Sequence, residues 1–413
     1  MTQKVTQFLF SRRGAASLVA ALAVLFAGEL IGLWQPDPCP ARASLAPAEF
    51  PPQSPLAGMG NAQALPIFAR QFNLTCTTCH IAFPQLNAFG RKFKELGYRM
   101  PDAPDPEAQH QHKVSENLTF LDNFPIAGHV QSVFFEKETG NAATFAPLTE
   151  ITLHVAGAVF EKGSAFLELG GDLGSGFAVS GTGRIGYHIS PYLNITAGQG
   201  DVFMVDPYNT LNSHILQTED PGGVDHRVVN VYGRWEKLYY SAGFSAGPTG
   251  QISTEYLGTL RLAYDISDDL SVGAFGILGS QLLPETDDNS GIKGDRLRAG
   301  VDVNYLLGTK LSLQALGALE KTTIAGQAQT RYDGWFQAYY TFIYEDRPIF
   351  VPLVRAELTQ TPDTGDNVVR LLGNVSTYVA ANARVGLEYA QEVVSPTGRD
   401  AISRFRAFGV ILF

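Results

Sequence analysis

The stretch "DRLRAGVDVNYLLGTKLSLQALGALEK" (295–321) carries the pattern that decides the fold of this chain. It contains two runs, 295–307 and 310–321, in which polar and apolar residues alternate, and a short turn divides them. Alternation with a period of two is typical of a β-strand that presents one face to a polar environment and the other to an apolar one. The two runs therefore predict a pair of antiparallel strands.

Runs of this kind recur from residue 127 to the end of the chain, and each is roughly ten residues long, the length that a strand needs to cross a bilayer. Gly and aromatic residues are frequent in them, and turn residues separate them. We count 16 candidate strands, to within two, at 127–136, 149–161, 164–171, 183–189, 192–200, 227–236, 238–246, 259–267, 270–280, 295–307, 310–321, 331–345, 349–358, 368–380, 382–394 and 402–413. Such segments are typical of a transmembrane β-barrel, in which the sheet closes because every backbone group in lipid must be paired.

The connections between these runs support a barrel that crosses the outer membrane, because short turns and longer loops alternate there. The stretch 172–182 fits this alternation least. The short connections lie at 161–163, 190–191, 236–237, 267–269, 307–309, 345–348 and 380–382, and the longer ones at 137–148, 201–226, 247–258, 281–294 and 359–367. We therefore expect an all-β fold, a 16-stranded antiparallel transmembrane barrel over 126–413, with lipid around it.

The last run adds a further sign of outer-membrane assembly. Its residues Phe405, Ala407, Gly409, Ile411 and Phe413 share one face of a strand, and the chain ends on the aromatic residue itself. This arrangement resembles the terminal signal that outer-membrane assembly machinery reads. A soluble all-β protein would instead have to expose the apolar face of a long sheet to water.

Composition and the N-terminus indicate an exported protein that does not bind nucleic acid. The chain has 40 acidic and 30 basic residues, so nothing supplies a basic face for a polyanion. A basic start followed by the apolar run 14–34 predicts a signal peptide, 1–43, with cleavage after Ala43 or, alternatively, after Ala64. The rival interpretations are a retained anchor and a lipoprotein at Cys39, but "PDPC" lacks the small and apolar residues expected before a lipidated cysteine.

The stretch "NLTCTTCHIAF" (73–83) holds the two remaining cysteines, Cys76 and Cys79, followed directly by His80. A zinc site would need a second pair of ligands, and a thioredoxin-like pair would need a βαβ pattern, which the sequence lacks. The third use is covalent attachment of one haem c, in which the thiols form thioethers and His80 becomes the proximal ligand of the iron. Export agrees with this use, and we predict a monohaem cytochrome c segment over 65–100, with His80 as its catalytic residue.

The residues after His80 predict a helix that ends at Gly97, with Pro84 near its start. Leu86, Phe89, Phe93 and Leu96 form one stripe of this helix. The segment is too small to build an ordinary core, so we expect the stripe to pack on the haem. A polar, Pro-rich linker, 101–125, follows it. Arg70, Arg91, Lys92 and Arg99 are candidate partners of the haem propionates or, alternatively, face solvent or a periplasmic partner.

The distal ligand of the iron remains open at the level of the sequence. Met100 follows His80 closely enough for the chain to fold around the haem edge, and it would raise the reduction potential. His110, His112 and His129 are the competitors, and an open or water-bound position is the third alternative.

The stretch "ALPIFARQFNLTCTTCHIAFPQLNAFGRKFKELGY" (64–98) resembles the fused monohaem cytochrome–porins of iron-oxidising bacteria, a family of outer-membrane Fe(II) oxidases. The family's Ala-x-Pro-x-Phe-Ala-Arg-Gln lead stands at 64–71, and its Pro-x-Leu-x-x-Phe-Gly-x-x-Phe-Lys-x-x-Gly-Tyr tail at 84–98. No motif of the family is matched in the barrel. The matching residues are Ala64, Pro66, Phe68, Ala69, Arg70, Gln71, Pro84, Leu86, Phe89, Gly90, Phe93, Lys94, Gly97 and Tyr98.

This resemblance implies that a haem c bound by Cys76, Cys79 and His80 oxidises extracellular Fe(II). The electrons would pass to a periplasmic carrier of the small-cytochrome or cupredoxin type. Arg70, Phe89 and Phe93 are the further haem-binding candidates. Two alternatives stay open: a general extracellular electron conduit with another donor or acceptor, and a solute porin with a haem plug.

Two further expectations concern the lumen and the outer loops. A barrel of this size leaves an aqueous lumen, which the haem segment or the loop 202–225 could fill. Acidic residues of the outer loops could attract Fe(II), or they could simply keep the surface wet. These residues are Glu219, Asp220, Glu285, Asp287 and Asp288.

Overall fold

The structure is a computed structural model, and it describes residues 66–72, 74–83, 85–100, 111–115, 118–121, 126–160, 162–172, 178–200, 226–247, 255–283, 292–308, 310–324, 326–344, 347–360, 365–380, 382–396 and 398–412. The predicted signal peptide, the loop 202–225 and the five acidic loop residues lie outside this part of the chain. The helices within it are α3 (Pro66–Phe72), α4 (Cys76–Cys79) and α5 (Ala88–Glu95). None of these helices is long and apolar enough to cross a membrane.

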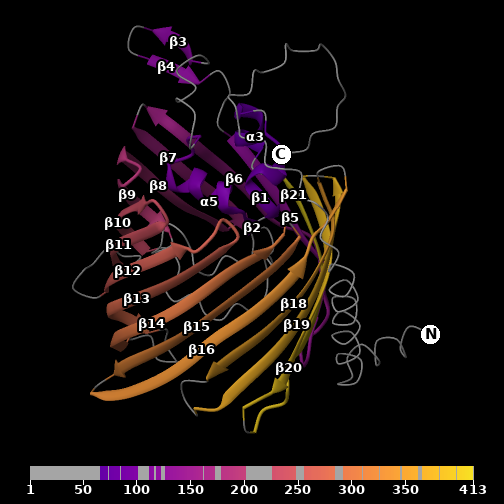
Figure 1. Cartoon of the computed structure of the whole chain (residues 1–413). Helices are drawn as coiled ribbons and strands as arrows, with labels where there is room; N and C mark the ends of the chain where they lie inside the picture. The colour runs from indigo at the N-terminus through magenta and orange to yellow at the C-terminus, as the bar shows by residue number, and fades with distance from the viewer. Residues whose placement is uncertain are drawn as a thin grey trace. The chain divides into compact units, whose positions relative to one another are not determined.

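The rest of the described chain forms a closed antiparallel barrel in which each strand pairs with the next (Figure 1). The last strand pairs with the first, β21 with β5, and this pairing closes the wall. The short β17 continues β16, and both pair with β18, so the described wall has 16 strands. The strands are β5 (Ile126–Glu138), β6 (Thr144–Phe160), β7 (Gly163–Asp172), β8 (Ala178–Ser190), β9 (Leu193–Gly200), β10 (His226–Trp235), β11 (Leu238–Ala246), β12 (Tyr256–Asp265), β13 (Leu270–Leu283), β14 (Ile292–Leu307), β15 (Leu311–Ile324), β16 (Gln327–Tyr340), β17 (Phe342–Tyr344), β18 (Arg347–Gln360), β19 (Asn367–Ala380), β20 (Ala383–Val394) and β21 (Ser403–Leu412). The predicted closed, 16-stranded antiparallel barrel is confirmed.

The outer surface of the barrel is apolar, as the alternating pattern requires. On β14, Leu297 and Val301 are 55% and 61% exposed, whereas Arg296, Arg298 and Asp302 between and beside them are buried. Water cannot satisfy backbone groups in lipid, so a closed sheet with an apolar outer face is the β-structure that a membrane accepts. The chain is an outer-membrane protein.

The two ends of the barrel differ in the length of their connections. At one end, two to four residues separate consecutive strands, and we name this the short-turn end. The connections at the other end are longer, except between Ile324 and Gln327, where a two-residue turn contains Gly326 with φ +83°. Short turns of outer-membrane barrels face the periplasm, so the predicted alternation and orientation agree with the strand boundaries.

The structure differs from the sequence-based expectation in two segments. The stretch 172–182 is mostly strand, because β8 already begins at Ala178. The predicted linker, 101–125, contains a two-stranded sheet of β3 (Gln111–Ser115) and β4 (Leu118–Leu121). Local pairing therefore continues into sequence whose composition indicated only an irregular connection.

Ion pairs line the inner face of the wall. Arg298 is fully buried and contacts Glu320 at 2.9 Å and Asp333 at 2.6 Å. Arg261 donates two hydrogen bonds to Asp302, at 2.7 and 3.0 Å. A buried charge is tolerated only with such a partner, and these pairs give the lumen a polar wall.

Candidate functional site

The segment 66–100, which we name the plug, contacts the inner wall at the short-turn end of the barrel. Arg234, next to the turn between β10 and β11, donates to both carboxylate oxygens of Glu95 at 2.7 Å. The hydroxyl of Tyr378, close to the turn after β19, donates to the carbonyl of Phe83 at 2.8 Å. Both contacts join the plug to strand ends at the same end of the barrel, so the expectation that this segment enters the mouth is confirmed.

The short helix α5 is fixed at its first turn by Asn87. The side-chain oxygen of Asn87 accepts from the backbone N–H of Gly90 at 2.9 Å, which is a helix cap. Its amide nitrogen donates to the carbonyls of Thr77 and Thr78 at 3.2 and 3.0 Å. One side chain therefore holds the start of α5 against the Cys-Thr-Thr-Cys turn of α4.

The end of α5 is a Schellman motif at Gly97, the residue predicted to end the helix. Gly97 has φ +67°, the Tyr98 N–H donates to the Phe93 carbonyl at 2.9 Å, and the Gly97 N–H donates to the Lys94 carbonyl at 3.0 Å. The rings of Tyr98 and Phe93 lie 6.0 Å apart, as expected for the hydrophobic contact of this motif. The turn directs the chain back towards the barrel wall.

The prediction that one helix covers the residues from Pro84 to Gly97 is wrong in its first part. His80–Ala82 and Gln85–Leu86 form two short paired strands, β1 and β2, and the helix begins only at Ala88. A residue before proline disfavours the helical region, and Pro84 stands between these strands in the sequence. Leu86 therefore belongs to β2 and not to the helical stripe.

The plug and the wall together enclose a cavity of about 630 Å³. Its lining includes Cys76, Cys79 and His80 of the plug, together with His129 and His154 of the wall. A volume of this size lies in the ~300–1,000 Å³ range of sites that bind small molecules and cofactors. The predicted triad of two thiols and an imidazole therefore borders a space that can hold a ligand.

The predicted aromatic residues gather beside this cavity. Phe93 is buried and lines it, and Phe89 packs on Phe93 with ring centroids 6.4 Å apart. Met100 packs on the same apolar cluster, together with Ile67, and is not among the residues that line the cavity.

The remaining predicted residues divide into those that the structure describes and those that it does not. Arg91 lines the cavity, whereas Arg99 donates to the Gly163 carbonyl of the wall at 2.7 Å. The backbone of Arg70 lies in α3 and that of His112 in β3, but their side chains fall outside the described residues, as does His110.

The last strand of the barrel packs against the plug at Cys76. Phe408, Val410 and Leu412 form a buried cluster on its inner face, and Cys76 and Phe83 pack against it. Ile411, between two of these residues, is 52% exposed, so neighbouring residues at this end of the strand lie on opposite faces of the wall.

Sequence reasoning missed His154 and Glu168. His154 Nε2 lies 3.1 Å from His129 Nδ1, and His154 Nδ1 lies 3.4 Å from Glu168 Oε2. His154 stands inside an apolar run, where nothing in the sequence separates a ligand from an ordinary inward-facing residue. The register that pairs Ala127 with His154, and His154 with Glu168, brings these side chains together.

Burial affects the ionisable groups of the plug. It raises the pKa of the Cys79 thiol to about 11, and the neighbouring Cys76 adds to this effect. It also lowers the pKa of the Arg91 guanidinium, which Asp265 and Glu95 oppose. An anionic ligand in the cavity would further stabilise the charged form of Arg91.

Within the described residues, no group of three or more His, Cys, Asp or Glu side chains is arranged to hold a metal ion by itself. The site thus offers two cysteines that form no disulfide, an adjacent imidazole, an aromatic wall and a cation around one space. These groups can attach and enclose a flat apolar cofactor with an anionic edge.

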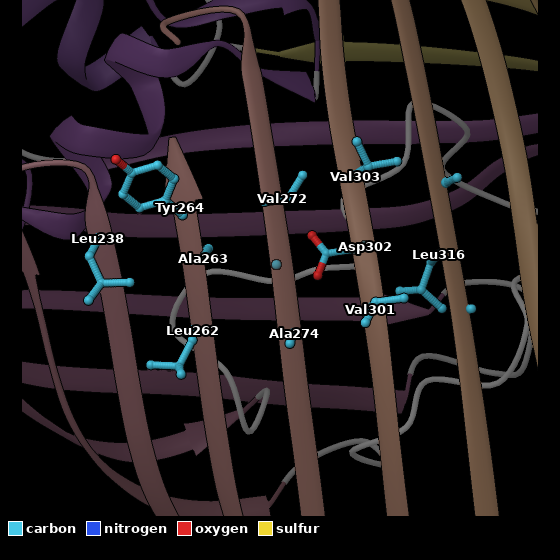
Figure 2. A pocket seen from close by; sticks show the side chains of 13 residues that line it. Leu238, Leu262, Ala263, Tyr264, Val272, Ala274, Val301, Asp302, Val303 and Leu316 are labelled. Carbon is cyan, nitrogen blue, oxygen red and sulfur yellow. The ribbon is translucent and has the colours of Figure 1, made fainter. Parts of the chain in front are cut away.

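A second hollow, of about 730 Å³, lies on strands β11 to β15 of the wall (Figure 2). Its lining is apolar, with exposed residues such as Leu262 and Val301. Asp302 is its one acid, and Arg261 binds both oxygens of that carboxylate. We therefore assign no chemistry to it.

No protein-family model matches the sequence, and no curated protein matches it. Solved structures of outer-membrane barrels do match the fold. OmpT, an outer-membrane protein of Vibrio cholerae, aligns with a TM-score of 0.55 and 12% identity over 70% of this chain and 98% of that chain. The anion-selective porin from Comamonas acidovorans aligns with a TM-score of 0.52 and 13% identity over 70% and 98%. OmpF of Salmonella typhi, in complex with daunomycin, aligns with a TM-score of 0.51 and 12% identity over 70% and 97%. At this level of identity the likeness shows the fold alone, which is the closed barrel of outer-membrane proteins.

Proposed function

We propose that this protein is a cytochrome–porin fusion that oxidises extracellular Fe(II) at one covalent haem c and passes the electrons to a periplasmic carrier. The observation that carries the proposal is that the C-x-x-C-H motif borders a cavity inside a closed outer-membrane barrel. A passive pore has no need for this motif at that place.

The residues around the cavity fit a haem. Cys76 and Cys79 form no disulfide, lie at partly exposed positions and could form the two thioether bonds, with the His80 imidazole as proximal ligand. Phe68 and Phe93 offer apolar surface to the porphyrin, and Arg91 offers a cation to a propionate. The volume of the cavity and the side chains around it both suit a haem.

A haem held by Cys76, Cys79 and His80 would supply a one-electron path from aqueous Fe(II), which would be oxidised to Fe(III), to a periplasmic acceptor, which would be reduced. Fe(III) precipitates near neutral pH, so oxidation without import of iron is an advantage to the cell. The plug lies at the short-turn end, where a soluble carrier in the periplasm has the shortest approach.

The residues of the chain hold this site rigid. The Glu95–Arg234 contact fixes α5 on the wall, and Asn87 fixes α4 on α5. Phe408 and Leu412 pack on Cys76 and exclude water from the side of the thioether bonds. A preorganised, partly dry site lowers the reorganisation that accompanies electron transfer.

A solute porin is the second candidate function, and the charged lumen favours it. The inner face of the wall is built from polar groups, including the buried ion pairs of Arg261, Arg298 and Arg355, as in a barrel with an aqueous lumen. A general electron conduit that uses another donor or acceptor is the third candidate, and it differs from the first only in its substrates.

Stopped-flow reduction of the purified, detergent-solubilised protein by Fe(II) tests the proposal. We expect one haem per chain by mass and a Soret band that shifts to its reduced position on mixing. A mass without haem, or a band that dithionite reduces and Fe(II) does not, would contradict the Fe(II) oxidase.

Two variants separate the candidates. Cys76→Ala, which leaves only the Cys79 thiol for attachment, should lower the covalent haem content and Fe(II) oxidation together, whereas Thr77→Ala, which leaves the motif intact, should keep both. Conductance in planar bilayers is measured in parallel. A large conductance that is unchanged in Cys76→Ala, without any Fe(II) oxidation by the parent protein, would favour the solute porin.

A further inference from the structure

The barrel wall presents two histidines to the same cavity that His80 borders. His129 on β5 and His154 on β6 are diagonal neighbours on the inner face, and both line the cavity. Their rings are stacked, with centroids 5.3 Å apart and an angle of 30° between the planes. They belong to the barrel, not to the plug that carries the C-x-x-C-H motif.

The contacts of this pair form a chain that ends at His129 Nε2, which lies near a carboxylate but makes no hydrogen bond to it. Glu168 Oε2 lies 3.4 Å from His154 Nδ1, and His154 Nε2 lies 3.1 Å from His129 Nδ1. The other nitrogen, His129 Nε2, lies 3.6 Å from Glu150 Oε1, which is beyond hydrogen-bond distance. His154 Nδ1 is buried, and Glu168 is its ion-pair contact although the geometry is not that of a hydrogen bond.

One assignment of protons agrees with the 3.1 Å contact between the two rings and leaves His129 Nε2 without a proton. If each imidazole is neutral, His154 carries its proton on Nδ1, towards Glu168, and accepts a hydrogen bond at Nε2 from His129 Nδ1–H. The lone pair of His129 Nε2 is then available. A histidine that donates its second nitrogen's proton to a neighbour is the usual arrangement of a metal-ligating imidazole.

We propose that His129 Nε2 is the sixth ligand of the haem iron, and that His154 and Glu168 are positioning residues that orient it. This inference rests on the haem c of the proposed function. The bond forms by donation of the His129 Nε2 lone pair to the iron in place of water, with no change of oxidation state. The plug thus supplies the proximal ligand and the barrel supplies the distal one.

The structure gives the rival ligand another role. Met100 packs on the apolar cluster of Phe68, Phe93 and Tyr98 and does not line the cavity. A flexible thioether is a common gap filler in such a cluster. Ligation by two imidazoles also implies a lower reduction potential than ligation by His and Met.

Spectroscopy of the full-length haem protein tests the assignment without reference to Fe(II) oxidation. We expect the oxidised parent to be low-spin and to lack the near-infrared sulfur-to-iron charge-transfer band of Met-ligated haem. His129→Ala should become high-spin and return to low-spin when imidazole is added. His129→Met should be low-spin, acquire the charge-transfer band and show a higher potential.

The variant of the positioning residue His154 and the control variants should differ in the reduction potential of the haem. His154→Gln should stay low-spin with a raised potential, because an amide oxygen is a weaker acceptor for His129 than an imidazole nitrogen and has no second nitrogen beside Glu168. Met100→Leu should match the parent. His188→Gln should match it too, since this buried wall histidine is bonded to Ser164 and Asn194 and does not line the cavity.

Three outcomes would overturn the inference while leaving the haem protein intact. They are a high-spin Met100→Leu, a high-spin His154→Gln with a low-spin His129→Ala, and a parent that is itself high-spin. Absence of haem from the purified protein is a different result, and it would refute the proposed function.

Discussion

The contact between Glu95 and Arg234 should control how firmly the plug sits in the barrel. Arg234 makes two hydrogen bonds of 2.7 Å to the Glu95 carboxylate and one of 2.5 Å to Asp265. The Tyr232 hydroxyl also donates to the Glu95 carbonyl, at 3.0 Å. The side chains of Arg234 and Glu95 are only 14% and 5% exposed, so solvent can replace little of this interaction.

Arg234→Ala would leave Glu95 buried without its counter-ion. Removal of one partner of a buried ion pair costs about 3–5 kcal/mol. Each 1.4 kcal/mol changes an equilibrium tenfold, so release of α5 from the wall should become roughly 10²- to 10³-fold more frequent. Arg234→Lys keeps the charge but loses the two-pronged geometry, and its effect should be smaller.

Hydrogen–deuterium exchange with mass spectrometry measures this release directly. Peptides that cover Ala88–Glu95 should exchange much faster in Arg234→Ala, whereas barrel strands should keep their protection. Arg404→Ala is the matched control, because it removes an arginine paired with Glu138 near the longer loops. Equal protection of α5 in the parent and in Arg234→Ala would refute the view that this contact anchors the plug.

Three further predictions concern the plug. Gly97→Ala should destabilise the plug by at least about 1–2 kcal/mol, because Gly97 has φ +67° and a Cβ there would lie 2.1 Å from His188 Nε2. Faster tryptic cleavage at Lys94 would measure this loss of stability. Gly140→Ala, at a φ of +82° with open space around it, should leave the plug unchanged, and equal cleavage of the two variants would contradict the reasoning. Asn87→Ala should cost about 0.5–2 kcal/mol of α5 stability in the same exchange experiment, and Asn87→Asp should recover only the cap on Gly90, because it lacks the donors to Thr77 and Thr78. In haem-free protein, the rate of iodoacetamide labelling of Cys79 should keep rising as the pH approaches about 11, because burial raises the pKa of this thiol. A labelling rate that levels off near pH ~8.5, as in the unfolded chain, would disprove this prediction.

The barrel was predictable because lipid imposes one rule on every strand. Residues such as Leu297 and Val301 must be apolar and their neighbours inward-facing, so the period of two is readable in the sequence. Strand ends were less predictable. The sequence indicated a connection at 137–148, but β5 continues to Glu138 and β6 begins at Thr144, with Glu136 paired to Thr144. Beyond the lipid both faces of a strand can be polar, and the alternation disappears.

The site was predictable only where its residues are adjacent in the chain. Cys76, Cys79 and His80 are recognisable because attachment of haem demands that spacing, and the structure places them around one cavity. His154 and Glu168 come together through the register of two hairpins, which no short motif records. Leu86 was assigned to a helix because its spacing matches that of Phe89 and Phe93, but periodicity cannot detect the hairpin that precedes Asn87.

Cys76 and Phe83 of the plug pack on Phe408, Val410 and Leu412 of β21, so docking of the plug depends on the last strand. The plug is the earliest of these segments to be synthesised and β21 is the last, and β21 also seals the cylinder by joining β5. The plug therefore cannot complete its contacts with the wall until β21 has been inserted. Docking of the plug therefore depends on completion of the barrel, and an unfinished barrel would leave the C-x-x-C-H motif exposed to the periplasm.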